Sequence, residues 1–229
     1  MAYCWLLTPL LRWGKIGVEI PHNRDGSMTA RIPENHPLCR LFREATQWAF
    51  EQGRLQDPLS DDPALKSYLS EEILARFVHV DNLYRLRDAR GRRLEDIAEM
   101  LMEGRARDTA PALMEFERQR HIGDYALFIT GVFPESLQRL RRHPTRPDRI
   151  MMSVGKLLLP FEHPEDYYRH QGKQAYSRAA ELSRRHGLEC ESLFEQLAAD
   201  YQAYVKAMSL VRLYLDASPL FQDAKRIIL

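Results

Sequence analysis

The chain has 229 residues, of which 45% are hydrophobic and 28% are charged, and its formal net charge is +1. These proportions are ordinary for globular proteins and lie outside the range of disordered chains. A chain of this length buries about 72% of its unfolded surface on folding, so its core needs no disulfide or structural metal. The near-zero net charge argues against a protein whose whole surface binds nucleic acid or anionic lipid.

The cysteines and the apolar stretches indicate the compartment. Cys4, Cys39 and Cys190 are an odd number without CxxC spacing, which favours a reducing cytoplasm over a disulfide framework or a thiolate zinc site. The apolar start of the chain lacks a basic n-region, and no uncharged stretch approaches the ~20 residues of a membrane helix. Most of the basic residues are arginines, which is typical of GC-rich bacterial genomes. We therefore expect a cytoplasmic bacterial protein without membrane contact.

The first 36 residues differ from the rest of the chain. The segments 13–20 and 27–32 contain β-branched residues and flank the turn signal Asn23-Arg-Asp-Gly26. This pattern predicts a short β-hairpin or an extended arm at 1–36, packed on a helical domain formed by residues 37–229.

Helical periodicity dominates from Pro37 onward. Apolar residues recur at helical spacing from Leu38 to Ala49, and Gly53 is placed to end that helix. Ser70 is a candidate N-cap for a second helix, which the sequence Asp88-Ala-Arg-Gly91 would end. The further helices that we expect span about 94–104, 109–133, 164–186 and 189–216. Residues 151–161 are either a short helix or a packed loop.

Two of the later helices carry informative patterns. The stretch from Tyr125 to Pro134 has no charge, which indicates a buried central helix, and Gly123 and Gly131 within it suggest a close helix contact or a deliberate break. The last helix repeats apolar residues at three- and four-residue steps, which is typical of a seam between helices. The seam consists of Leu197, Tyr201, Tyr204, Met208, Val211 and Leu215. We predict an all-α fold, a single-domain bundle of about six to seven helices.

The common catalytic motifs are missing from the sequence. It contains no Walker A motif, dinucleotide-binding fingerprint, zincin motif, nucleophile elbow or EF-hand loop. Catalysis therefore has no positive support, and no cofactor is predicted.

Acid–histidine pairs on the expected helices suggest one alternative. Glu117, His121 and Asp124 lie on one helix face, Asp166 and His170 stand four residues apart, and His79 stands seven residues after Glu72. Carboxylates and imidazoles that converge from several helices hold iron or manganese in bundle proteins. The candidate ligands are Glu117, His121, Asp124, Asp166, His170 and His79. The Glu-x-x-His spacing of ferritin-like sites is missing. We therefore favour ordinary hydrogen bonding of these side chains over metal binding.

Two arginine-rich segments suggest another alternative. One contains Arg139, Arg141, Arg142, Arg146 and Arg149, and the other contains Arg85, Arg87, Arg90, Arg92 and Arg93. The guanidinium group matches phosphate and carboxylate well, so the first segment is our candidate anion site. The alternative is that these segments pair with the acidic stretch at 51–72, within the chain or across a dimer.

The leading hypothesis is a binding, adaptor or regulatory module that acts through protein–protein contacts. In this hypothesis the chain also forms a homodimer through the 197–215 helix if the seam of that helix is exposed. The alternative is an iron- or manganese-dependent helical oxidase. The third is nucleic-acid binding through residues 139–149, which lack interleaved aromatic residues and a DNA-reading motif.

Overall fold

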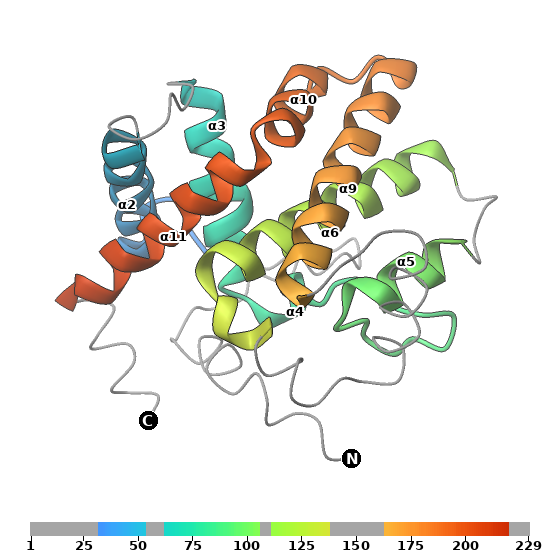
Figure 1. Cartoon of the computed structure of the whole chain (residues 1–229), viewed down its shortest axis with the longest axis horizontal. Helices are drawn as coiled ribbons and strands as arrows, with labels where there is room; N and C mark the ends of the chain where they lie inside the picture. The colour runs from blue at the N-terminus through green and yellow to red at the C-terminus, as the bar shows by residue number, and fades with distance from the viewer. Residues whose placement is uncertain (1–31, 54–61, 106–110, 138–162, 220–229) are drawn as a thin grey trace. The chain divides into compact units, whose positions relative to one another are not determined.

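The computed structural model describes residues 32–53, 62–105, 111–137 and 163–219. Within these ranges the chain forms nine helical segments and no strand, which confirms the all-α class (Figure 1). It divides into two compact units. Leu86–Val205 makes up unit 2, and the described residues on either side of that range, up to Arg85 and from Lys206 onward, make up unit 1. Nothing in the composition of the sequence marks this division.

Unit 1 is built from helices near both ends of the chain. Its elements are α2 (Pro37–Gly53), α3 (Pro63–Ser67), the π-helical segment η2 (Tyr68–Ala75), α4 (Val80–Leu83) and most of α11 (Tyr201–Ala217). Helix α2 has the predicted bounds and buries the predicted apolar positions, among them Phe42, Ala45 and Ala49. It packs on η2 and α3, and the Trp48 ring lies 5.5 Å from the Tyr214 ring of α11.

The second helix of the chain begins earlier than predicted, so the N-cap assigned to Ser70 is wrong. The helical stretch starts at Pro63, where the Asp62 carboxylate caps it by accepting the Ala64 backbone N–H at 2.8 Å. Ser70 lies inside η2, and its hydroxyl donates to the Lys66 carbonyl at 2.9 Å. Both residues are good caps in general, and the proline at the first helical position decides between them.

Unit 2 holds the central helix of the sequence prediction. Its elements are α5 (Ile97–Arg105), α6 (Ala112–Val132), α9 (Pro164–His186), α10 (Glu191–Ala199) and the first turn of α11. Helix α6 is buried continuously from His121 to Val132, as its uncharged stretch predicts. Helix α9 has the predicted bounds and is followed by Gly187 in the left-handed conformation.

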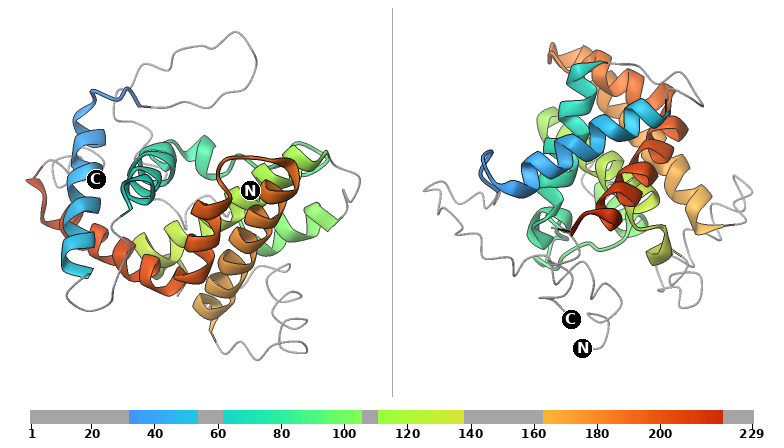
Figure 2. Two further views of the ribbon diagram at one scale, coloured as in Figure 1. Left: turned by 90° about the horizontal axis from the view of Figure 1, so that it is seen from above. Right: turned by 90° about the vertical axis from the view of Figure 1, so that its left-hand side faces the viewer.

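Helices α6 and α9 pack closely against each other in an antiparallel arrangement (Figures 1 and 2). Gly123 on α6 lies against the Tyr176 ring, where an added Cβ would come within 2.6 Å of ring carbons. Gly172 on α9 faces the Ala126 methyl group of α6, which would lie 2.7 Å from an added Cβ. The two glycines therefore allow a helix spacing that alanine would prevent, which confirms the prediction of a close helix contact at Gly123.

The last predicted helix, 189–216, is two helices. Helix α10 ends at Ala199, and the carbonyl of Asp200 accepts the N–H groups of Ala203 and Tyr204 at the start of α11. Aspartate favours helix ends because its side chain competes with the helical hydrogen bonds. The hydrophobic period continues across this break, so the sequence pattern did not reveal it.

The apolar seam of the last helix is not an exposed face. All six of its residues, from Leu197 to Leu215, are buried in the folded chain. The prediction that this seam forms a homodimer surface depended on its exposure, and that condition is not met. Self-association of the chain stays a prediction, without this seam as its surface.

Several predictions concern residues outside the described ranges. These are the arm or hairpin before Ile32, the start of the helix expected at 109–133, the candidate anion site at 139–149 and the apolar run 151–161. Among the helices that the structure describes, none combines the length and the apolarity required to cross a bilayer.

The close contact at Gly123 predicts the effect of a single methyl group. A helical glycine replaced by alanine ordinarily gains about 1 kcal/mol of stability. Gly123→Ala should instead lower the free energy of unfolding by about 1–3 kcal/mol, because the new Cβ overlaps the buried Tyr176 ring. Urea denaturation measures the change. Gly104→Ala is the control, since its Cβ meets only the movable guanidinium of Arg118. A stabilised Gly123→Ala protein would contradict the close approach.

Candidate functional site

Helix α6 places two of the predicted site residues, His121 and Asp124, in the core of unit 2, where both are 0% exposed. The Asp124 carboxylate accepts a hydrogen bond of 2.9 Å from the Tyr176 hydroxyl on α9. The Arg120 guanidinium, one turn earlier on α6, approaches the other carboxylate oxygen at 3.8 Å. A buried carboxylate needs such partners, because taking it out of water without them costs several kcal/mol.

Two further polar side chains lie beside this pair. Thr130 is buried on α6, and its hydroxyl donates to the Ala126 carbonyl at 2.7 Å. Tyr201, at the start of α11, places its hydroxyl against Gly172 and interacts with Thr130. Burial raises the pKa of Tyr201 well above its ordinary value, and the interactions with Thr130 and Arg169 offset only part of that effect.

We call Asp124, Thr130, Tyr176 and Tyr201 the buried polar cluster. Each of the four is 2% exposed or less. A carboxylate hydrogen-bonded to a tyrosine could exchange protons with a substrate only if the substrate could reach it. The arrangement instead suits a structural role, since buried hydrogen-bonded groups fix how two helices pack.

A second tyrosine–aspartate contact orders the start of α5. Asp96 caps this helix: one carboxylate oxygen accepts the Ala98 N–H at 2.6 Å, and the other accepts the Tyr168 hydroxyl at 2.6 Å. The Tyr125 hydroxyl of α6 donates to the Glu95 carbonyl at 2.7 Å. Two tyrosines of α9, Tyr168 and Tyr176, thus bury their rings and donate their hydroxyl groups to buried aspartates.

The six predicted metal ligands are not brought together. Glu117 lies 3.7 Å from the Arg120 guanidinium, and Asp166 is exposed near Arg169. His79 belongs to unit 1, where burial lowers its pKa and Asp81 partly opposes that effect. Within the described ranges no three His, Cys, Asp or Glu side chains form a group that could hold a metal ion. Iron or manganese binding therefore stays a prediction, and the described residues supply no site for it.

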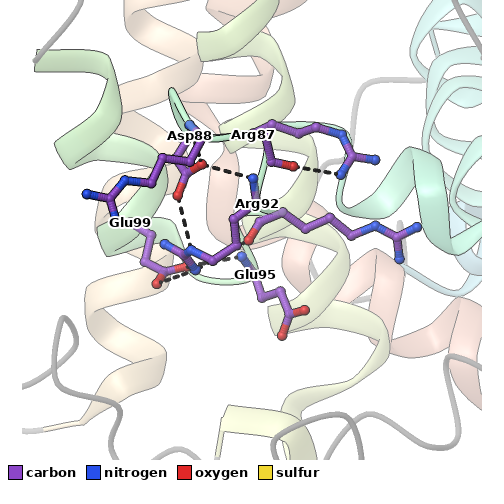
Figure 3. A network of polar contacts seen from close by, with 8 residues as sticks. Arg87, Asp88, Arg92, Glu95 and Glu99 are labelled. Carbon is purple, nitrogen blue, oxygen red and sulfur yellow. Dashed lines mark hydrogen bonds and ion pairs between the residues drawn. The ribbon is translucent and has the colours of Figure 1, made fainter. Parts of the chain in front are cut away.

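The arginine-rich segment that the structure does describe, 85–93, forms a tight turn (Figure 3). Arg87 and Arg93 are bridged as in an antiparallel pair, and the Asp88 carboxylate accepts the backbone N–H groups of Arg90 and Arg92 at 2.9 Å. The hydrogen bond from the Arg92 backbone contributes most to a lowered pKa of Asp88.

One arginine of this turn is used internally. The Arg92 guanidinium donates to Asp88 at 3.1 Å and to Glu99 of α5 at 3.0 Å. Glu95 lies beside Glu99, and its pKa is raised by burial first and by that carboxylate second. Arg92 is therefore paired within the chain, but with Asp88 and Glu99 and not with the acidic stretch at 51–72. Figure 3 shows Asp88 and Arg92 turned toward Glu99, whereas the Arg87 side chain extends away from them.

An exposed apolar group lies where α5 ends and α6 begins. Met102 is 47% exposed, Leu113 61% and Met114 57%. Arg118, one turn after Met114 on the same face of α6, covers Gly104 of α5 and donates to the Met100 carbonyl at 3.4 Å. The ends of the two helices are therefore neighbours. Sequence reasoning missed this group, because Leu113 stands at helical spacing from the buried Phe116 and would be assigned to the core.

Comparison with known proteins adds no functional assignment. No protein-family model matches the chain, and no curated protein or solved structure matches it. The function must therefore be argued from the residues themselves.

The contact between Tyr176 and Asp124 predicts a measurable loss of stability. Tyr176→Phe keeps the ring and removes the hydroxyl that donates to the Asp124 carboxylate at 2.9 Å. The free energy of unfolding should fall by about 1–3 kcal/mol, because Asp124 stays buried. Tyr214→Phe is the matched control, since this half-exposed tyrosine contributes its ring to Trp48. Equal effects in denaturant titrations of the two variants would contradict the assignment.

The raised pKa of Tyr201 predicts a pH dependence at the alkaline end. Its pKa is higher in the folded protein than in the unfolded chain, where it is about 10. The neutral tyrosine therefore stabilises the fold fully below pH 10, and this contribution is lost as the pH rises above that value. Denaturation between pH 8 and 11 should show a smaller decline for Tyr201→Phe than for the wild type. A parallel decline in both proteins would refute the role of Tyr201.

Proposed function

We propose that the protein is a cytoplasmic binding module of adaptor or regulatory type, which contacts another polypeptide through Met102, Leu113 and Met114. We call these three residues the apolar contact group. The observation that carries the proposal is their exposure at the neighbouring ends of α5 and α6.

The energetic argument rests on what a partner would cover. Burying a leucine or methionine side chain that is otherwise in water contributes about 1.5–3 kcal/mol. Methionine also adapts its shape to different partners, because its side chain is unbranched and flexible. Single exposed apolar residues are common on protein surfaces, so three at adjoining helix ends is the relevant feature.

The site chemistry favours binding over catalysis. Asp124 and its tyrosine partner Tyr176, a hydrogen-bonded pair that could transfer a proton, are 0% exposed. A substrate could reach them only if α6 and α9 separated, and the close contact at Gly123 opposes that separation. The accessible chemistry of unit 2 is therefore apolar contact and charge, as in a docking surface.

The partner is either another protein or a second copy of this chain, and one experiment separates the two. A photo-crosslinking amino acid replaces Met102, and the chain is irradiated in cells and again in purified form. We expect an adduct at Met102 that falls about tenfold when Leu113→Glu and Met114→Glu are combined, because two of the three apolar contacts become charged. Sedimentation equilibrium of the purified chain identifies self-association.

The control variant for this experiment is Leu213→Glu on α11. Leu213 is 59% exposed, which matches Leu113 and Met114, and it does not belong to the apolar contact group. This substitution should leave the Met102 adduct unchanged. Loss of the adduct in both variants, or no adduct at Met102 under any condition, would overturn the proposal.

A further inference from the structure

The turn at 87–93 holds its arginines in a fixed geometry. Hydrogen bonds join Leu86 to Leu94 and Asp88 to Arg92, so Arg87 and Arg93 between them form a non-hydrogen-bonded antiparallel pair. The side chains of such a pair leave the backbone on the same side, with Cβ atoms about 4.5–5.5 Å apart. Asp88 fixes the loop between them through two backbone N–H groups.

The exposed arginines of the turn have the chemistry to bind an anion. An oxyanion placed against the guanidinium groups of Arg87 and Arg90 would accept their N–H donors in charge-assisted hydrogen bonds. Such bonds are roughly twice as strong as those between neutral groups.

Arg92 is exposed but paired with Asp88 and Glu99, and two further arginines of the turn are open to solvent. Arg87 and Arg90 are exposed, and neither forms an ion pair within the described part of the chain. The Arg87 guanidinium makes one long hydrogen bond, 3.3 Å, to the Gly91 carbonyl. Because the Arg92 guanidinium is paired with Asp88 and Glu99, it helps to fix the shape of the turn. Arg87 and Arg90 are the arginines that a ligand could contact.

The surroundings of the turn limit the size of the anion. Glu95 lies two residues before α5, and Glu99 and Glu103 follow on that helix. These carboxylates would repel a nucleic-acid backbone that continued past the turn, and the turn itself has no aromatic side chain on which a base could stack. A short acidic stretch that ends at the turn avoids this repulsion.

We propose that the Arg87–Arg93 turn binds an acidic polypeptide segment, whose carboxylate or phosphate side chains lie against Arg87 and Arg90. This rests on the proposed function, because it assigns to the partner polypeptide a chemistry that matches the turn. The turn is followed directly by α5, which carries Met102, so the partner presents acidic residues next to apolar ones.

Fluorescence anisotropy of labelled probes tests this assignment on the full chain. The probes are a ten-residue peptide with five glutamates, the same peptide with two phosphoserines in place of two glutamates, and a 20-nucleotide single-stranded RNA. We expect both peptides to bind more tightly than the RNA, and the tighter of the two identifies carboxylate or phosphate as the natural group. Tighter binding of the RNA, or no binding of either peptide, would overturn the proposal.

Variants separate this turn from a general charge effect. Arg87→Gln with Arg90→Gln should weaken peptide binding about tenfold, because two exposed charge-assisted contacts are lost. Arg40→Gln with Arg178→Gln removes the same charge from exposed positions on α2 and α9 and should change binding by less than about twofold. Equal losses in the two double variants would refute the site.

A third variant tests whether the shape of the turn matters. Asp88→Ala makes the chain more positive and removes the carboxylate that fixes the loop. Peptide binding should weaken, whereas a general charge effect would strengthen it and would overturn the assignment. Circular dichroism checks that each variant is folded.

Failure of this inference and failure of the proposed function give different results. If the peptides do not bind while the Met102 adduct persists, the turn is not the site and the binding module stands. If the peptides bind but no adduct forms at Met102, the turn is assigned correctly and the apolar contact group is not.

Discussion

The close packing of α6 on α9 is the constraint on which unit 2 depends. Two glycines, Gly123 and Gly172, remove the side chains that would hold these helices apart. The hydrogen bond between Tyr176 and Asp124 then fixes their register, because a buried carboxylate tolerates few other arrangements. Two other tyrosines also join helices by hydrogen bonds. The Tyr168 hydroxyl of α9 donates to Asp96, which caps α5, and the Tyr125 hydroxyl of α6 donates to the carbonyl of Glu95, the residue before Asp96.

Charge in this protein acts locally. The net charge of +1 is the result of arginine-rich and acid-rich segments that nearly cancel over the whole chain. The turn before α5 shows how one such segment is used: Asp88 and Glu99 take up Arg92, and the exposed arginines keep their charge available. A small net charge argues against a general polyanion binder and is compatible with recognition of a short anion.

The sequence predicted the parts of the fold that depend on local rules. The bounds of α2 and α9 follow from a proline at the start, a glycine at the end and a helical apolar period between them. The break at Asp200 could not be predicted, because the apolar period runs through it unchanged. The burial of α6 after Tyr125 was predicted from its uncharged stretch, but the buried contact between Asp124 and Tyr176 was not, because that contact depends on how two distant helices pack.

The seam at 197–215 and the apolar contact group show why periodicity is a poor guide to binding surfaces. A regular apolar period forms when one helix face meets the rest of its own chain over its full length, so the most regular pattern in this sequence marks the core. Residues that face a partner need not follow a regular apolar period, because they can lie at a helix end that no other helix of the chain covers. Leu113 and Met114 lie in the first turn of α6, which is exposed, whereas the helix is buried from His121 onward. The surface that we propose for another protein therefore lies where sequence period and burial disagree.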